Sequence, residues 1–241
     1  MKIFKVLVVL AILSLMGVSS AVFAKDQVDR GPLTKITFIH YKKDKNQAKP
    51  GGSPKPSPSI CYGYLAKGAK WKTTEDFFVN PTGSTADPTT VLPAINAGVA
   101  AWETAAHTEI FTNGILDGSA TYNDGNFIGQ NTASFGTYSD PNVIAVTTVW
   151  GYLSAPPPMR ELVEWHMLFN TDFTWGTFEA NPAAMDLQNI ATHELGHSAG
   201  MDDLYTTSCT LETMYGYSTE GETSKRDLYN GDIKGIQALY L

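Results

Sequence analysis

The sequence has little that would tie the protein to nucleic acid, to a membrane or to a fibrous assembly. Its 241 residues hold two cysteines, and 17 lysines and arginines stand against 24 acidic residues, for a net charge of −7. The basic residues form no cluster, which argues against a nucleic-acid-binding surface. No repeat at solenoid spacing and no heptad run occurs, which excludes repeat arrays and coiled coils.

The composition that remains is that of a globular protein. Hydrophobic residues make up 43% of the chain and charged residues 17%, too apolar for a disordered protein. The length suits one domain with a full core, or two small domains.

The first 24 residues are typical of a secretory signal peptide. Lys2 and Lys5 supply a positive start, residues 6–18 are almost entirely apolar, and residues 22–24 offer a cleavage site. The apolar run is shorter than the ~20 residues that span a bilayer, and no later segment could span one. We therefore expect a secreted protein, with an uncleaved membrane anchor as the alternative.

The two cysteines, Cys61 and Cys209, allow one intramolecular pairing. Export would make a disulfide chemically permissible. Two free buried thiols are the alternative.

The region before Cys61 differs in composition from the rest. Residues 33–41 alternate and are β-branched or aromatic, which predicts a strand. Residues 42–59 are rich in lysine, proline, glycine and serine, which is typical of a linker. We expect the compact domain to cover residues 61–241, with residues 25–60 as an outlying strand and linker.

Within the compact domain the pattern predicts an α+β fold, since strands come first and two helices close the chain. Apolar residues at steps of three and four predict a helix over residues 88–106. The other expected elements are strands at 76–80, 143–150 and 162–169, and helices at 182–199 and 232–240.

One segment carries chemistry: His193-Glu194-Leu195-Gly196-His197. Histidines at i and i+4 lie one above the other on a helix, so both can reach one metal ion. Glu194 is turned about 100° away and can touch a metal-bound water without being a ligand. Zinc would activate that water, and Glu194 would accept its proton.

The motif continues beyond His197. Gly200 can take the positive φ that ends a helix and turns the chain sharply. That turn can bring Asp203 back to the ion as a third ligand, which leaves the fourth position open, as catalytic zinc requires. The remaining histidines all precede the motif, so none can replace Asp203 from further along the chain. The alternative is that Asp202 and Asp203 are both turn residues.

The extended motif resembles that of the metzincin metallopeptidases, and most closely the matrixin type. Asp203 stands where the main family pattern has histidine, as in some secreted bacterial metzincins. Thr213-Met214-Tyr215 is similar to the family's Met-turn, in which a methionine lies beneath the zinc. Residues 232–240 resemble the matrixin C-terminal helix. The resemblance covers residues 61–241.

The resemblance implies a twisted mixed sheet of about five strands over helices, with a cleft beside the zinc. Residues 143–150 would be the edge strand that binds substrate antiparallel, with an interior strand as the alternative. The matrixin cysteine-switch motif is absent, and residues 25–60 could be a pro-segment or carry an added edge strand.

The function implied is that of a secreted zinc metalloendopeptidase, with His193, His197 and Asp203 as metal ligands and Glu194 as general base. A secreted zinc-bearing binding module without activity is the alternative. We expect protein or peptide substrates, no nucleic-acid partner, no stable membrane association after signal cleavage, and a monomer. Structural Ca²⁺ is a further possibility, with oxygen ligands from the family's acidic segment and a turn-rich stretch: Asp172, Asp117, Asn123, Asp124 and Asn126.

Overall fold

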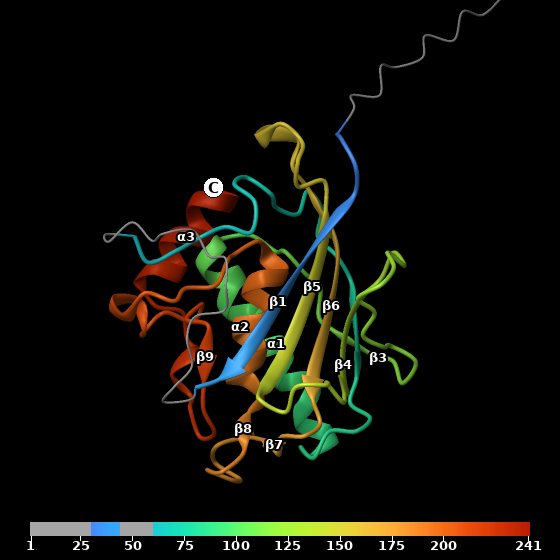
Figure 1. Cartoon of the computed structure of the whole chain (residues 1–241), viewed down its shortest axis with the longest axis vertical. Helices are drawn as coiled ribbons and strands as arrows, with labels where there is room; N and C mark the ends of the chain where they lie inside the picture. Colours follow the sequence, from blue (N-terminus) through green and yellow to red (C-terminus); the bar gives the residue numbers. More distant parts are fainter. Residues whose placement is uncertain (1–29, 44–59) are drawn as a thin grey trace, which may run out of the picture.

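A computed structural model describes residues 30–43 and 60–241. It has a mixed seven-stranded sheet with helices α1 and α2 behind it, and α3 packs against α1 (Figure 1). The predicted α+β class is confirmed. The expected signal peptide and residues 44–59 of the expected linker lie outside the described residues.

The sheet order is β3-β2-β4-β6-β5-β1-β9. The first five strands in this order correspond to the expected five-stranded sheet, and β1 and β9 extend it beyond β5. The strand bounds are β1 Thr34–Lys42, β2 Phe77–Asn80, β3 Ile115–Leu116, β4 Asn131–Gly136, β5 Val143–Gly151, β6 Leu162–Asn170 and β9 Tyr217–Ser218. A separate two-stranded sheet pairs β7 Trp175–Gly176 with β8 Met185–Asp186.

Two of the three helices begin close to where the sequence predicts. Helix α1 spans Pro88–Ala106 and α3 spans Asn230–Tyr240. Helix α2 spans Leu187–Ala199 and begins five residues later than expected. Asp186 caps it by accepting a hydrogen bond from Asn189 N, and the preceding residues form a turn and β8. Short 3₁₀ helices lie at Pro157–Met159, Thr207–Cys209 and Ser224–Arg226.

Strand β1 does not lie outside the compact domain, contrary to expectation. It pairs antiparallel with β5 over most of its length and parallel with β9 at its end. The blue strand in Figure 1 therefore runs alongside β5, which becomes an interior strand rather than the expected edge. The side chain of Phe38 joins the main hydrophobic core.

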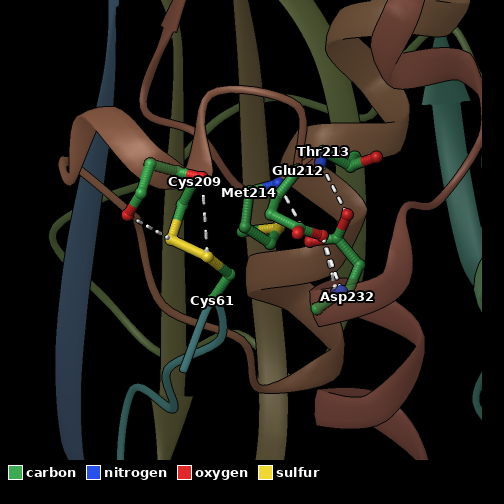
Figure 2. Close-up of a disulfide and its surroundings, with 8 residues drawn as sticks. Cys61, Cys209, Glu212, Thr213, Met214 and Asp232 are labelled. Atoms are coloured by element: carbon green, nitrogen blue, oxygen red, sulfur yellow. Dashed lines mark hydrogen bonds between the residues drawn. A yellow bond between two sulfur atoms is a disulfide. The ribbon is translucent and has the colours of Figure 1, made fainter. Parts of the chain in front are cut away.

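The disulfide between Cys61 and Cys209 is present, with Cα atoms 5.4 Å apart. It ties the start of the compact domain to the loop before Met214 (Figure 2). In the same view the carboxylate of Asp232, on α3, accepts hydrogen bonds from the backbone N–H groups of Thr213 and Met214. The Met214 loop is thus held from two sides.

No helix in the described ranges combines the length and apolar character that crossing a membrane requires.

Candidate metal and catalytic site

Helix α2 carries the motif, and nearly all of its side chains are buried. Two tryptophans brace its backbone: the indole N–H of Trp102 donates to Thr192 O and that of Trp71 donates to Ser198 O, each at 2.7 Å. A buried helix cannot rotate to bury a different face. The directions of its histidines are therefore fixed by packing.

Gly200 ends α2 with φ at +111°, in the left-handed region. A Cβ atom at this position would also lie 2.8 Å from Ala69 O, so glycine is required both by conformation and by space. The sharp turn that was expected from the sequence is therefore present, and it returns the chain toward the histidines.

The turn brings Asp203 to both histidines. Its Oδ1 lies 3.3 Å from His193 Nε2 and 3.4 Å from His197 Nε2. Two ligand atoms bound tetrahedrally at 2.0–2.1 Å from one zinc ion lie about 3.3–3.4 Å apart. The three side chains could thus hold a zinc ion.

The hydrogen bonds around the histidines leave the correct nitrogens free. His193 Nδ1 donates to Thr213 O at 2.7 Å, and His197 Nδ1 donates to Met201 O at 3.1 Å. Carbonyl oxygens only accept, so each Nδ1 carries the proton and each Nε2 presents a lone pair in the neutral ring. His193 Nε2 and Asp203 Oδ1 are buried without a hydrogen-bond partner among the described residues, a costly arrangement that a metal ion would relieve.

Electrostatics at the cluster also favour a cation. Burial would raise the pKa of Asp203, but His197 and His193 outweigh it and hold that pKa far below its usual value. Burial would lower the pKa of His197, yet the neighbouring Asp203 raises it to about 8. Tyr205 donates to Asp203 Oδ2 at 3.0 Å and orients the carboxylate.

Met214 lies against α2 at the site. A Cβ atom added to Gly196 would overlap Met214 Sδ and approach the Trp102 ring to 2.6 Å, so only glycine fits between the two histidines at this contact. The predicted packing of a methionine beneath the motif is therefore present, and the anchoring of its loop by Asp232 fixes its position.

Glu194 is fully buried beside the cluster, and one of its oxygens lies within 4.8 Å of a nitrogen of His193. Its Oε1 accepts from His40 Nδ1 at 2.9 Å and its Oε2 accepts from the hydroxyl of Thr147 at 2.6 Å. Burial would raise the pKa of Glu194, but the hydrogen bond from His40 and the nearby His193 outweigh this effect and lower it. The group is therefore a carboxylate that can only accept protons.

Strand β1 supplies two site residues that the sequence reasoning missed. The ring of Phe38 stacks on His197 with centroids 3.8 Å apart, and the ring of His40 lies 3.9 Å from that of His193. A nitrogen of His40, one of His193 and an oxygen of Glu194 lie within 4.8 Å of one another. The only sequence signal was that both residues fall on the same face of an alternating strand.

Calcium binding at the expected oxygen ligands stays a prediction. Among the described residues the two clusters of three or more acidic, histidine or cysteine side chains both lie at the α2 site. Asp117 instead accepts hydrogen bonds from Ser119, and Asn123 accepts from the backbone of Gly125 and Asn126.

A second buried glutamate–histidine pair lies in the sheet on β6. Glu164 accepts hydrogen bonds from the backbone N–H groups of Ile128, Gly129 and Gln130. His166 Nε2 donates to Glu164 Oε1 at 2.7 Å, and His166 Nδ1 lies 2.8 Å from Thr132 Oγ1. Every polar side-chain atom of this pair has a partner.

The fold and the α2 cluster are those expected from the resemblance to the matrixin-like metzincins. Residues 146–241 match the family model of the matrixins. The chain is 27% identical to karilysin of Tannerella forsythia over 181 residues, which cover 73% of this chain and 34% of karilysin. It is 41% identical to the metalloendoproteinase 2-MMP of Arabidopsis thaliana over 64 residues, 27% of this chain and 16% of that protein.

These matches confirm the resemblance to the matrixin-like metzincins that the motifs indicated. It spans about a third of the length of karilysin and less of the plant protein. What those whole proteins do is therefore carried to this chain only as a proposal.

Proposed function

We propose that the protein is a secreted zinc metalloendopeptidase that hydrolyses internal peptide bonds. The observation that carries the proposal is the distance of Asp203 Oδ1 from His193 Nε2 and His197 Nε2, which matches a tetrahedral zinc site. The buried carboxylate of Glu194 directly follows His193 in the sequence. Zinc, when bound, supplies a Lewis acid that polarises a peptide carbonyl and makes water more acidic.

The chain's own residues supply the remaining functions. His193, His197 and Asp203 hold the ion, and the carbonyls of Thr213 and Met201 fix the two ring orientations. Glu194 accepts a proton from the attacking water and passes it to the leaving amine, because its lowered pKa keeps it ionised until then. Thr147 holds that carboxylate in place.

The proposed substrate is an extended peptide that adds to the sheet beside β5, where β1 lies in this structure. Export is supported by the signal-like first 24 residues and by the disulfide, which persists in oxidising compartments. We also propose that the protein is a monomer without stable membrane association after signal cleavage. Structural calcium at Asp172 or in the stretch 117–126 stays a prediction.

The alternative is a zinc-bearing binding module that does not cleave. The intact Glu194, already ionised and oriented by two hydrogen bonds, favours an enzyme. Casein or gelatin hydrolysis with and without a chelator distinguishes the two functions.

The ligand assignment is tested by zinc content after dialysis. Asp203→Ala is expected to lose the metal, because it removes the oxygen that lies between the two Nε2 atoms. Asp202→Ala is the matched control: its Oδ1 accepts only the backbone N–H of Asp203, so zinc content should change little. Metal loss in Asp202→Ala with retention in Asp203→Ala would mean that the third ligand is wrongly assigned.

A further inference from the structure

Lys225 is a buried cation that the proposed chemistry does not use. It lies on the short 3₁₀ helix Ser224–Arg226 and is 1% exposed, although lysine is almost never fully buried unless it is paired. Burial lowers the pKa of Lys225, and the neighbouring Glu222 partly offsets this effect. Burial of a charge is costly, so the groups that compensate the ammonium of Lys225 indicate what this residue holds in place.

The ammonium group of Lys225 holds the backbone of β9. Nζ donates to Tyr217 O and to Glu222 Oε1, each at 2.7 Å, and it lies 3.5 Å from Ser218 Oγ. The carboxylate of Glu222 accepts in turn from the hydroxyl of Ser218 at 2.8 Å. Hydrogen bonds from a charged donor are stronger than neutral ones, so the carbonyl of Tyr217 is held on the side that faces Lys225.

The same group of side chains joins β9 to α2. Asn189 precedes His193 by four residues, so it lies on the same face of α2 as the two histidines of the motif. Its side chain donates to Ser218 Oγ at 3.2 Å and accepts the backbone N–H of Lys225 at 2.7 Å. Asn189 and Ser218 are as deeply buried as Lys225. The position of β9 is therefore fixed relative to the helix that carries the proposed ligands.

The contact of Lys225 with one edge of β9 leaves the other edge available. Successive carbonyl groups of a strand point to opposite edges, so Ser218 O faces away from Lys225, and here it accepts Lys43 N at 2.8 Å. A peptide that adds antiparallel to β5 has to run in the same direction as β1, because β1 is itself antiparallel to β5. Strand β9 lies beside the last two residues of β1. It would thus lie beside the C-terminal part of such a peptide.

We propose that Lys225 is a positioning residue for peptide substrates: it holds β9 where this strand receives the C-terminal part of a peptide bound beside β5. The proposal rests on the proposed peptidase function for its kinetic consequence, whereas the effect on β9 can be measured without a substrate. The hydrogen bonds of the Lys225 side chain go to Tyr217, Ser218 and Glu222, and not to the proposed ligands or to Glu194. Its removal should therefore weaken peptide binding and leave the reaction of a bound peptide unchanged.

The test compares three full-length, zinc-loaded proteins: wild type, Lys225→Met and the control Glu164→Gln. Lys225→Met keeps an unbranched apolar side chain and removes the ammonium group. Glu164→Gln also alters a buried charged group, but on β6, so it controls for a general loss of stability. Two peptides share one cleavage site, and the short one lacks the C-terminal part of the long one. The measurements are KM and kcat for each peptide, zinc content, and hydrogen exchange of the β9 amides.

In Lys225→Met, KM for the long peptide should rise about tenfold with kcat nearly unchanged, equivalent to about 1.4 kcal/mol of lost binding. KM for the short peptide and the zinc content should stay at their wild-type values, and exchange of the β9 amides should become faster. Glu164→Gln should match wild type in all four measurements. Lys225→Arg, which keeps the charge and the donors, should restore most of the affinity for the long peptide.

Three results would overturn the proposal: a wild-type KM for the long peptide in folded Lys225→Met, an equal rise in KM for both peptides, or a fall in kcat together with loss of zinc. If Lys225→Met does not fold, the shorter and uncharged Lys225→Gln takes its place under the same criteria. If no protein, wild type included, cleaves either peptide, the peptidase function is what fails. Exchange of the β9 amides then decides alone whether Lys225 positions this strand.

Discussion

Two buried glutamate–histidine pairs lie in the same molecule and are partnered differently. Glu164 and His166 have every hydrogen-bonding atom satisfied, chiefly by the backbone of residues 128–130. Glu194 and His40 are equally buried, but His40 Nε2 has no partner among the described residues. The comparison teaches that burial alone does not mark a functional carboxylate; incomplete satisfaction beside a ligand cluster does.

The largest expected effect concerns turnover. Glu194→Gln should lower turnover by about 10²–10⁴-fold, because the amide cannot accept the water's proton. Glu164→Gln should leave turnover per folded molecule nearly unchanged. Zinc content measured alongside serves as the control. Near-normal turnover by a zinc-loaded Glu194→Gln protein would refute the assigned role.

Removal of the disulfide tests whether the two glutamate–histidine pairs need a distant covalent bond to keep their positions. Cys61→Ser with Cys209→Ser should lower the free energy of unfolding by up to about 5 kcal/mol, because the bond closes a long loop in the unfolded chain. Neither cysteine contacts a member of the two pairs, so zinc content of the folded protein should be retained. Urea denaturation measures the free energy of unfolding. Loss of zinc at low urea would instead mean that the bond positions the Met214 loop.

Removal of the Glu164 carboxylate, whose oxygens are fully hydrogen-bonded, should lower stability rather than turnover. Glu164→Ala leaves the N–H groups of residues 128–130 without their acceptor, and a broken buried pair typically costs about 3–5 kcal/mol. Urea denaturation and faster hydrogen exchange at residues 128–130 are the measurements. If unfolding is unchanged, the pair does not hold this loop.

The smallest effects are expected from two matched substitutions, one at the threonine beside each glutamate–histidine pair. Thr132→Val removes the hydroxyl that contacts His166 and should lower the free energy of unfolding by about 1 kcal/mol. Thr147→Val removes the hydroxyl that orients Glu194 and should reduce turnover several-fold instead. Equal effects of the two variants on both quantities would remove the distinction between the pairs.

The sequence predicts the α2 site well because its determinants are local. The spacing of His193 and His197 requires only a helix, and Gly200 and Asp203 follow within six residues. The disulfide was similarly constrained, since Cys61 and Cys209 allow one pairing. Geometry that depends on a few neighbouring residues can be inferred from their order.

What the sequence could not supply is contact between distant segments. The alternation in residues 33–41 predicts a strand but not its partner, and the polar segment before Cys61 suggested separation from the compact domain. The pairing of β1 with β5 joins residues more than 100 positions apart. The late start of α2 has a local cause, because Asp186 is a better cap than the apparent helix start at Pro182.

Gly196 takes no part in the proposed chemistry, yet its position tolerates no side chain, because a Cβ atom there would overlap Met214 Sδ and press on the ring of Trp102. Helix α2 and the Met214 loop are therefore packed as closely as two backbones allow at this point. A scan of substitutions should find this position as intolerant as a ligand position, for a reason of space alone.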